Sequence, residues 1–282
     1  MEYEVHDHDR GLAFDLATLL QRRRVLTLIG GAGLVALAGC ASGDDSGDDS
    51  ATDNAPGTTG TTSGATSAQS SGTGGCAEIP EETAGPYPGD GSNGPNILAT
   101  SGIVRRDIRS SFGSASGVAK GVPLTINLTI LNAAGGCAPY AGAAVYLWHC
   151  DINGGYSMYS QGITGENYLR GVQEADAAGA LSFTSIFPAA YSGRWPHIHF
   201  EVYPSLAKAT ASGNKIATSQ LALPESVCST VYASDGYGAS VRNLAQTSLG
   251  SDNVFRDGYA QQLASVTGSV PAGYVASLSA PV

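Results

Sequence analysis

The sequence predicts an all-β domain, a two-sheet β-sandwich with long loops and little helix. The first reason is the composition, because 38 Gly and 13 Pro among 282 residues favour a fold with many turns. The second is that runs of β-branched and aromatic residues alternate with clusters of turn-forming residues, a spacing typical of sandwiches. The third is that helical periodicity is weak along the whole chain and no internal repeat stands out.

The expected strands follow from polarity and residue type. One run is rich in β-branched residues, one is apolar and aromatic, and two alternate with a period of two, as a half-buried strand does. These strands are, in order, 122–131, 142–150, 180–187 and 197–203, with a weaker one at 215–223. Turns are expected at 132–139, 153–155, 176–179 and 188–193. A short helix is expected near 240–245 or 254–263.

The first 40 residues resemble an export signal that ends in a lipidation site. Three arginines, Arg22 to Arg24, precede an apolar run of residues 25–38, which is too short for a comfortable membrane span. The arginine pair resembles a twin-arginine signal, and residues 37–40 (LAGC) resemble a bacterial lipobox. We expect an exported lipoprotein that contacts the membrane only through lipidated Cys40. The alternative is an ordinary secretory signal that happens to contain a cysteine.

Residues 41–75 are expected to form a disordered tether before a folded domain at 76–282. This segment contains Gly, Ser, Thr and Asp but no Leu, Ile, Val or aromatic residue, so it has too little apolar surface to offset the entropy of ordering. The chain carries a formal net charge of −10, and the sequence has no basic patch that would neutralise phosphates. A nucleic-acid partner is therefore not expected.

Four cysteines remain in the domain once Cys40 is set aside: Cys76, Cys137, Cys150 and Cys228. An even number in an exported domain predicts two disulfides, and the three possible pairings stay open. A zinc site is the weaker alternative, because the spacings are long and the sequence has no Cys-x-x-Cys pair.

The segment His197-Ile198-His199 lies in an expected strand. Alternate side chains of a strand share a face, so the two imidazoles point the same way and suit two adjacent ligands of one metal. A pair of histidines on a solvated strand face is the simpler reading of this motif alone. Nearby Tyr191, and Tyr156 after a Gly-rich turn, add oxygen donors and make a nitrogen and oxygen set without thiolate, which suits iron. A phenol has a free pKa of about 10, so a tyrosinate ligand needs a strong Lewis acid such as Fe(III).

A series of ordered motifs resembles the intradiol ring-cleavage dioxygenases over about residues 80–225. The order and spacing of the motifs make this resemblance specific, because they recur over more than a hundred residues. The matching segments are 82–88 (ETAGPYP), 148–151 (WHCD), 155–157 (GYS), 167–173 (NYLRGVQ), 183–186 (FTSI) and 188–200 (PAAYSGRWPHIHF).

The resemblance implies a two-sheet sandwich and Fe(III) held by Tyr156, Tyr191, His197 and His199. It implies that Tyr191 leaves the iron and takes up a proton when a catechol binds through both oxygens, while Tyr156 stays bound. No organic cofactor is implied. The substrates would be a small catechol and O₂, and the product a muconate-type dicarboxylic acid.

Arg194 and Gln220 complete the implied site. The resemblance places Arg194 beside the substrate ring, where it would stabilise developing negative charge. Gln220, in the segment 218–221 (TSQL), resembles an amide of the family that supports the site without binding the metal. The chain departs from the family at Ala189 or Ala190, where glycine is usual. It also lacks the helical segment that precedes the domain in the catechol-type dimers, so no oligomeric state is implied.

Two other classes of function remain as alternatives. One is a non-catalytic exported β-sandwich that serves as a binding module, and the other is a metal-dependent hydrolase that uses the His-x-His pair. The hydrolase lacks further Asp or Glu ligands at a useful spacing. Tyrosinate bound to Fe(III) would colour the protein red-brown, which neither alternative would do.

Overall fold

The computed structural model describes residues 76–282 of the chain. The expected signal segment, its lipidation site Cys40 and the expected tether at 41–75 lie outside the described residues. Within the described part of the chain, no helix is both long and apolar enough to cross a membrane.

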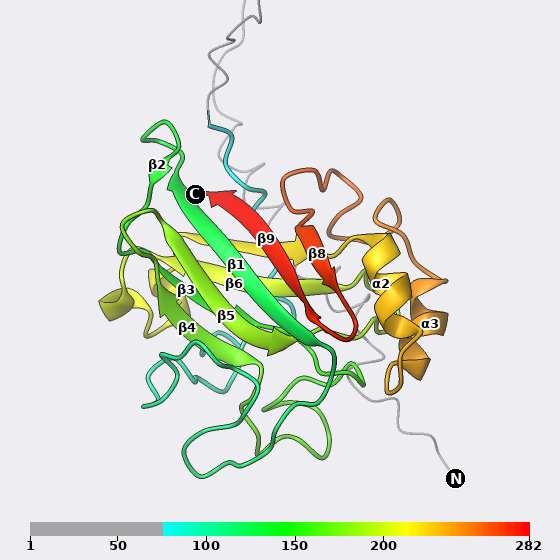
Figure 1. Cartoon of the computed structure of the whole chain (residues 1–282). Coiled ribbons are helices and arrows are strands. Elements are labelled where there is room, and N and C mark those ends of the chain that lie inside the picture. Colours follow the sequence, from blue (N-terminus) through cyan, green and yellow to red (C-terminus); the bar gives the residue numbers. More distant parts are fainter. Residues whose placement is uncertain (1–75) are drawn as a thin grey trace, which may run out of the picture.

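Strands in two sheets make up most of the regular structure, as expected for an all-β sandwich (Figure 1). The first sheet has the order β2-β1-β9-β8, with β5 also paired to β1. The long strand β1 pairs in parallel with the C-terminal strand β9 and antiparallel with β5. The strands of this sheet are β1 (Pro123–Asn132), β2 (Ala138–Pro139), β5 (Ala180–Ile186), β8 (Ser265–Ser269) and β9 (Gly273–Pro281).

The second sheet has the order β4-β3-β6-β7, and all of its pairings are antiparallel. Its register places Trp148 on one side of His199 and Gln220 on the other. The two neighbouring strands therefore place one residue on each side of the histidine. The strands are β3 (Ala144–Trp148), β4 (Arg170–Glu174), β6 (His197–Tyr203) and β7 (Ala217–Ala222).

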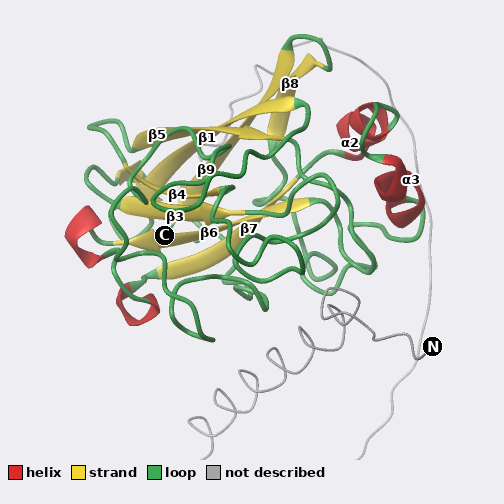
Figure 2. Ribbon diagram, turned by 90° about the horizontal axis from the view of Figure 1, so that it is seen from below, coloured by secondary structure: helices red, strands yellow, loops and turns green. Residues whose placement is uncertain are grey.

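The alternation of β6 divides its side chains between two environments. Ile198, Phe200 and Val202 pack into the main core between the sheets, which Figure 2 shows as two layers. His197 and His199 therefore face the other side of the second sheet. Loops cover that side, because a second cluster packs Trp148 and Tyr146 of β3 against residues of 97–103 and 156. The polar groups of β6 are thus buried beneath loops and not between the sheets.

Helix is scarce, and its positions differ in part from expectation. The α-helices are α2 (Glu225–Tyr232) and α3 (Gly238–Leu244), with short 3₁₀ turns η2 (Leu206–Lys208) and η3 (Ser212–Asn214). The helix α3 overlaps the expected 240–245, whereas 254–263 forms turns. The helix α2 was not expected; it begins after Pro224, whose fixed φ suits a helix start. Strands β2, β4, β8 and β9 were also not expected.

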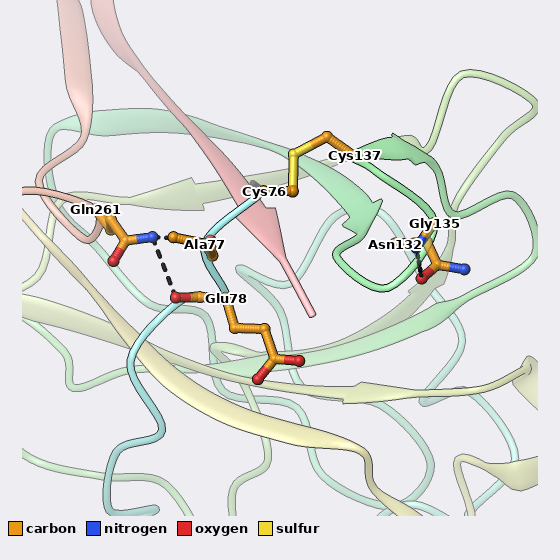
Figure 3. Close-up of a disulfide and its surroundings, with 7 residues drawn as sticks. All are labelled: Cys76, Ala77, Glu78, Asn132, Gly135, Cys137 and Gln261. Carbon is orange, nitrogen blue, oxygen red and sulfur yellow. Dashed lines mark hydrogen bonds between the residues drawn. A yellow bond between two sulfur atoms is a disulfide. The ribbon is translucent and has the colours of Figure 1, made fainter. Parts of the chain in front are cut away.

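One of the two expected disulfides is present. Cys76 and Cys137 are bonded, with their Cα atoms 5.4 Å apart, and join the start of the domain to the turn after β1 (Figure 3). The prediction of a second disulfide is wrong, because Cys150 and Cys228 are buried free thiols. Cys228 lies on α2 in the main core, and Cys150 packs in the cluster around Trp148. Each fills apolar space as a small hydrophobic side chain, a common use of free cysteine.

The pairing predicts different chemical reactivity for the two cysteine pairs. In denatured, unreduced protein, peptide mapping after alkylation should find Cys150 and Cys228 labelled, and Cys76 and Cys137 labelled only after reduction. Cys137→Ser should lower the free energy of unfolding by about 4 kcal/mol, because the bond closes a separation of 61 residues. Urea unfolding without reductant measures this, and an unchanged midpoint would contradict it.

Candidate metal centre and active site

The two histidines of β6 face each other as the sequence predicts. Their Nε2 atoms lie 3.0 Å apart, and both rings are almost fully buried. The Nδ1 atom of His197 lies 2.5 Å from the Trp195 carbonyl oxygen, so it carries the hydrogen and leaves a lone pair on Nε2. The ring of His199 stacks on Trp148 at an interplanar angle of 3°. The first ring is thus oriented by a hydrogen bond and the second by stacking.

Tyr156 reaches the same place from the loop after β3. A tight turn precedes it, in which Asp151 Oδ1 accepts hydrogen bonds from the N–H groups of Asn153 and Gly155. The Tyr156 N–H donates to Ser160 Oγ in the next turn. The side chain is buried, and its ring lies 5.0 Å from that of Tyr87. Tyr156 is therefore held from both its backbone and its ring.

Tyr191 comes from the loop between β5 and β6, and its side chain is half-buried. Its hydroxyl lies 3.2 Å from His197 Nε2 and 3.4 Å from the hydroxyl of Tyr156. Helix α3 holds this loop: Ser240 Oγ accepts from the Ala190 N–H, and Asn243 Nδ2 donates to the Ala190 carbonyl. The alanine at this departure from the family pattern is thus accommodated by a buried, hydrogen-bonded loop.

The four donor atoms form a compact set that fits a ferric ion. Consecutive separations of 3.0, 3.2 and 3.4 Å link the two imidazole nitrogens and the two phenol oxygens. Among residues 76–282, no cluster of three or more His, Cys, Asp or Glu side chains occurs that could hold a metal. Phenolate with imidazole is a hard donor set that suits Fe(III).

Burial sets the protonation of the donors. It lowers the pKa of both His197 and His199 well below the usual value, so the imidazoles are neutral and keep a lone pair for a ligand. Burial also raises the pKa of Tyr156 well above its usual value, with a further contribution from Tyr191. Without a cation the Tyr156 phenol would stay protonated, and a strong Lewis acid would be required to make it a phenolate.

The third histidine of the domain lies apart from this set. His149 is buried, with Nδ1 2.8 Å from the Cys150 carbonyl oxygen and Nε2 2.7 Å from Ser185 Oγ. Burial lowers its pKa to about 4. Both ring nitrogens are occupied by the protein, so His149 serves the packing of the strand ends.

Arg194 is fully buried beside the donor set and is held by two side chains. Its Nε donates to Asp252 Oδ2 at 3.0 Å, and its Nη2 donates to Gln220 Oε1 at 2.6 Å. Gln220 in turn donates from Nε2 to the Thr83 carbonyl oxygen. Gln220 therefore contacts Arg194 directly, and Asp252 adds a carboxylate that the sequence did not indicate.

A second buried arginine fixes the loop of Tyr156. Arg170 on β4 donates to the carbonyl oxygens of Tyr87, Pro88 and Ser157 at 2.8 to 2.9 Å. It also donates to Ser157 Oγ and to the hydroxyl of Tyr146. Arg170 thus ties the N-terminal segment of the domain to the Tyr156 loop. Arg170 lies in one of the motifs that carry the resemblance, but its position in the site was not predicted.

Gly154 allows the loops of Tyr156 and Tyr191 to approach each other. Its φ is +83°, and a Cβ built there would lie 3.0 Å from Cβ of Tyr191. Gly154→Ala should lower the free energy of unfolding by about 1–2 kcal/mol, because a side chain is disfavoured at this φ. It should also displace Tyr191 and alter visible absorption of the iron-loaded protein. Gly162→Ala, also at positive φ but with open space around it, is the matched control for strain without contact. Equal spectra for the two variants would contradict the contact.

The fold and the site define a β-sandwich with a buried centre of two histidines and two tyrosines. A family model described as Dioxygenase matches residues 94–211. Among solved structures, an intradiol ring-cleavage dioxygenase from Tetranychus urticae is 24% identical, with a TM-score of 0.56, covering 73% of this chain and 94% of that chain. A second dioxygenase is 22% identical, with a TM-score of 0.57 and the same coverage. No match was found among the curated proteins.

A further similar structure is the dioxygenase domain of a carbohydrate-binding fusion protein from Streptomyces sp. SirexAA-E. It is 23% identical, with a TM-score of 0.46, and the match covers 73% of this chain and 98% of that one. The family model, together with the shared fold of the dioxygenase from Tetranychus urticae, confirms the resemblance that the sequence motifs predict.

Proposed function

We propose that this protein is an Fe(III)-dependent dioxygenase that opens the ring of a catechol between its two hydroxyl-bearing carbons. The observation that carries the proposal is the convergence of two phenol oxygens and two imidazole nitrogens, with a buried arginine beside them. A non-catalytic binding module has no need of a guanidinium held by two buried partners next to such a set.

In this proposal, iron is held by Tyr156, Tyr191, His197 and His199. Bound Fe(III) supplies the Lewis acidity that makes a catecholate reactive toward O₂. Tyr191 is the ligand suited to leave, because its side chain is half-buried and sits on a loop, whereas Tyr156 is buried and tied at backbone and ring. The Tyr191 oxygen would then be placed to accept a proton from an incoming catechol hydroxyl and so to act as an internal base.

Arg194 supplies a fixed positive charge on the substrate side of the site. Arginine stays protonated at any relevant pH, so it can stabilise the negative charge that develops on the substrate without itself titrating. Its partners Asp252 and Gln220 hold the guanidinium in one orientation, so little reorganisation accompanies the reaction. The product would be a muconate-type dicarboxylic acid containing both atoms of O₂.

We also propose that the enzyme acts outside the cytoplasm as a lipoprotein. The arginine-led apolar run and the cysteine at position 40 support export and lipidation. The disulfide Cys76–Cys137 supports an oxidising compartment, since such bonds are rare where thiols are kept reduced. Cell fractionation with labelling by a radioactive fatty acid tests this, and Cys40→Ser should release the protein from the membrane fraction.

Oxygen uptake by the purified, iron-loaded protein tests the proposed reaction. The substrates would be catechol, protocatechuate, hydroxyquinol and larger lignin-derived catechols, each with the product identified by mass. Uptake of one O₂ per ring, with both oxygen atoms in a ring-opened diacid, is the expected result. A colourless protein that binds a catechol without consuming O₂ would favour the binding module instead.

A further inference from the structure

Asp252 lies in the segment after α3, far along the chain from the motifs of the site. Its carboxylate is completely buried and forms an ion pair with Arg194, whose side chain is 1% exposed. The Oδ2 atom that accepts from Arg194 Nε at 3.0 Å also accepts from the Trp195 N–H at 2.7 Å. One oxygen of Asp252 thus contacts both the guanidinium and the backbone that follows it.

The same oxygen is linked to the first histidine through one peptide unit. Trp195 donates its N–H to Asp252, and its carbonyl oxygen accepts from His197 Nδ1. The indole of Trp195 is fixed separately by its Nε1–H, which donates to the Leu223 carbonyl oxygen. Asp252 therefore contacts the Arg194 guanidinium directly but is linked to His197 through Trp195. The hydrogen bond of the Trp195 indole also holds Trp195 in place, so the position of His197 does not depend on Asp252 alone.

The other carboxylate oxygen of Asp252 holds the turn that carries Phe255 near His197. Asp252 Oδ1 accepts from the N–H groups of Val254 and Phe255, at 2.8 and 3.2 Å, and so caps a short turn. This turn places the ring of Phe255 6.5 Å from that of His197. All four contacts of the carboxylate are donors, so an amide in its place would set an N–H group against at least one of them.

We infer that Asp252 is a positioning residue that aims Arg194 at the substrate. The Asp252 carboxylate accepts from Nε and the Gln220 amide oxygen accepts from Nη2, so two nitrogens of the guanidinium are held and its plane is fixed. A buried ion pair adds little net stability, because desolvation of the two charges offsets their attraction. We therefore expect this pair to act mainly by orienting the charge of Arg194. The inference rests on the proposed function, because it assigns Asp252 to the same reaction through Arg194.

A double-mutant cycle separates positioning from a general structural role. Asp252→Asn in the iron-loaded protein should lower kcat by about tenfold or more, with a smaller change in KM, because a preorganised charge is lost from the transition state. In the Arg194→Ala protein the same substitution should change kcat by less than about twofold, since residues that act through one another do not add. Asp176→Asn, at an exposed turn that Asp176 Oδ1 caps in the same way, is the control for loss of a cap alone.

Thermal unfolding of the iron-free protein gives a readout that does not depend on turnover. Asp252→Asn should lower the Tm more in the protein with Arg194 than in the Arg194→Ala protein, because the single change replaces the carboxylate that pairs with Arg194 by a neutral amide. If Asp252→Asn alone does not fold, the comparison of Arg194→Ala with the double variant still decides, with equal kcat supporting the inference.

Two results would overturn the inference while leaving the proposed function intact. One is a wild-type enzyme that cleaves catechol and an Asp252→Asn variant that does so at the same rate. The other is an equal loss of kcat in both backgrounds, which would make Asp252 act independently of Arg194. Absence of ring cleavage by the iron-loaded wild-type protein on any catechol would instead defeat the proposed function and this inference together.

Discussion

Tyr156→Phe is expected to lose iron and most of the visible colour, whereas Tyr191→Phe is expected to keep iron and to bind catechol slowly. The two phenols differ in their surroundings. Tyr156 is buried, packed against Tyr87 and tied through its backbone, so in the proposed site its oxygen would stay bound to the metal. Tyr191 is half-buried on a loop, and its oxygen lies within 3.4 Å of two other donors.

The expected magnitudes follow from these roles. Removal of the Tyr156 oxygen takes away a buried ligand, and we expect iron affinity to fall by about tenfold or more, at least as much as for loss of a group that only supports a ligand. Removal of the Tyr191 oxygen takes away the base that accepts the catechol proton. Stopped-flow absorption without O₂ measures the binding rate, and metal analysis after gel filtration measures the iron content.

Tyr274→Phe is the matched control for the loss of a phenol oxygen. Tyr274 lies on β9 in the core between the sheets, packed against Phe187, and should leave iron content and colour unchanged. Equal iron content and equal binding rates for Tyr156→Phe and Tyr191→Phe would contradict the division of roles between them.

Local pattern was enough to predict the fold class and the central strand. The alternation in residues 197–203 predicted that the two histidines share a face, and β6 has these bounds. Of the strands that were missed, β9 depends on a distant partner, because it pairs in parallel with β1, about 150 residues earlier in the chain. Its stability comes from this pairing and from burial of one face, which a local window cannot detect.

The site was predictable where its residues lie in ordered motifs and not elsewhere. Tyr156, Tyr191 and Arg194 follow recognisable turns, and the structure brings their side chains together with the histidines. Asp252 has no motif around it and reaches Arg194 only because the chain leaves β7, forms two helices and returns. A signal was present in the run Ser251-Asp252-Asn253-Val254-Phe255, where an Asp before apolar residues is typical of a capped turn. The cysteines show the same limit. Their even number predicted two disulfides, whereas two of the four are buried as free thiols in the structure.

Arg194→Ala is expected to keep iron, colour and catechol binding while turnover falls by about 10² or more. The guanidinium contacts Asp252 and Gln220. Trp195 follows Arg194 in the chain and accepts from His197 Nδ1, so Arg194 is linked to this histidine through Trp195 and not as a second ligand of the same ion. It should therefore not be needed to hold the metal. The loss in rate is the usual size for removing one preorganised donor from a water-poor site.

Steady-state O₂ uptake gives kcat and KM for this variant, and anaerobic titration with catechol gives the affinity of the ground state. If Arg194 stabilises charge that develops only during the reaction, kcat should fall much more than the affinity. Arg106→Ala is the control, since Arg106 is exposed and contacts Ser182 on the first sheet. Arg194 is instead fully buried and lies just before the strand of the two histidines, so a structural role would appear as a lower Tm and lost iron at unchanged kcat per iron. Normal turnover per iron in Arg194→Ala would therefore show that Arg194 takes no part in the reaction. It would also contradict the proposed position of the substrate beside Arg194.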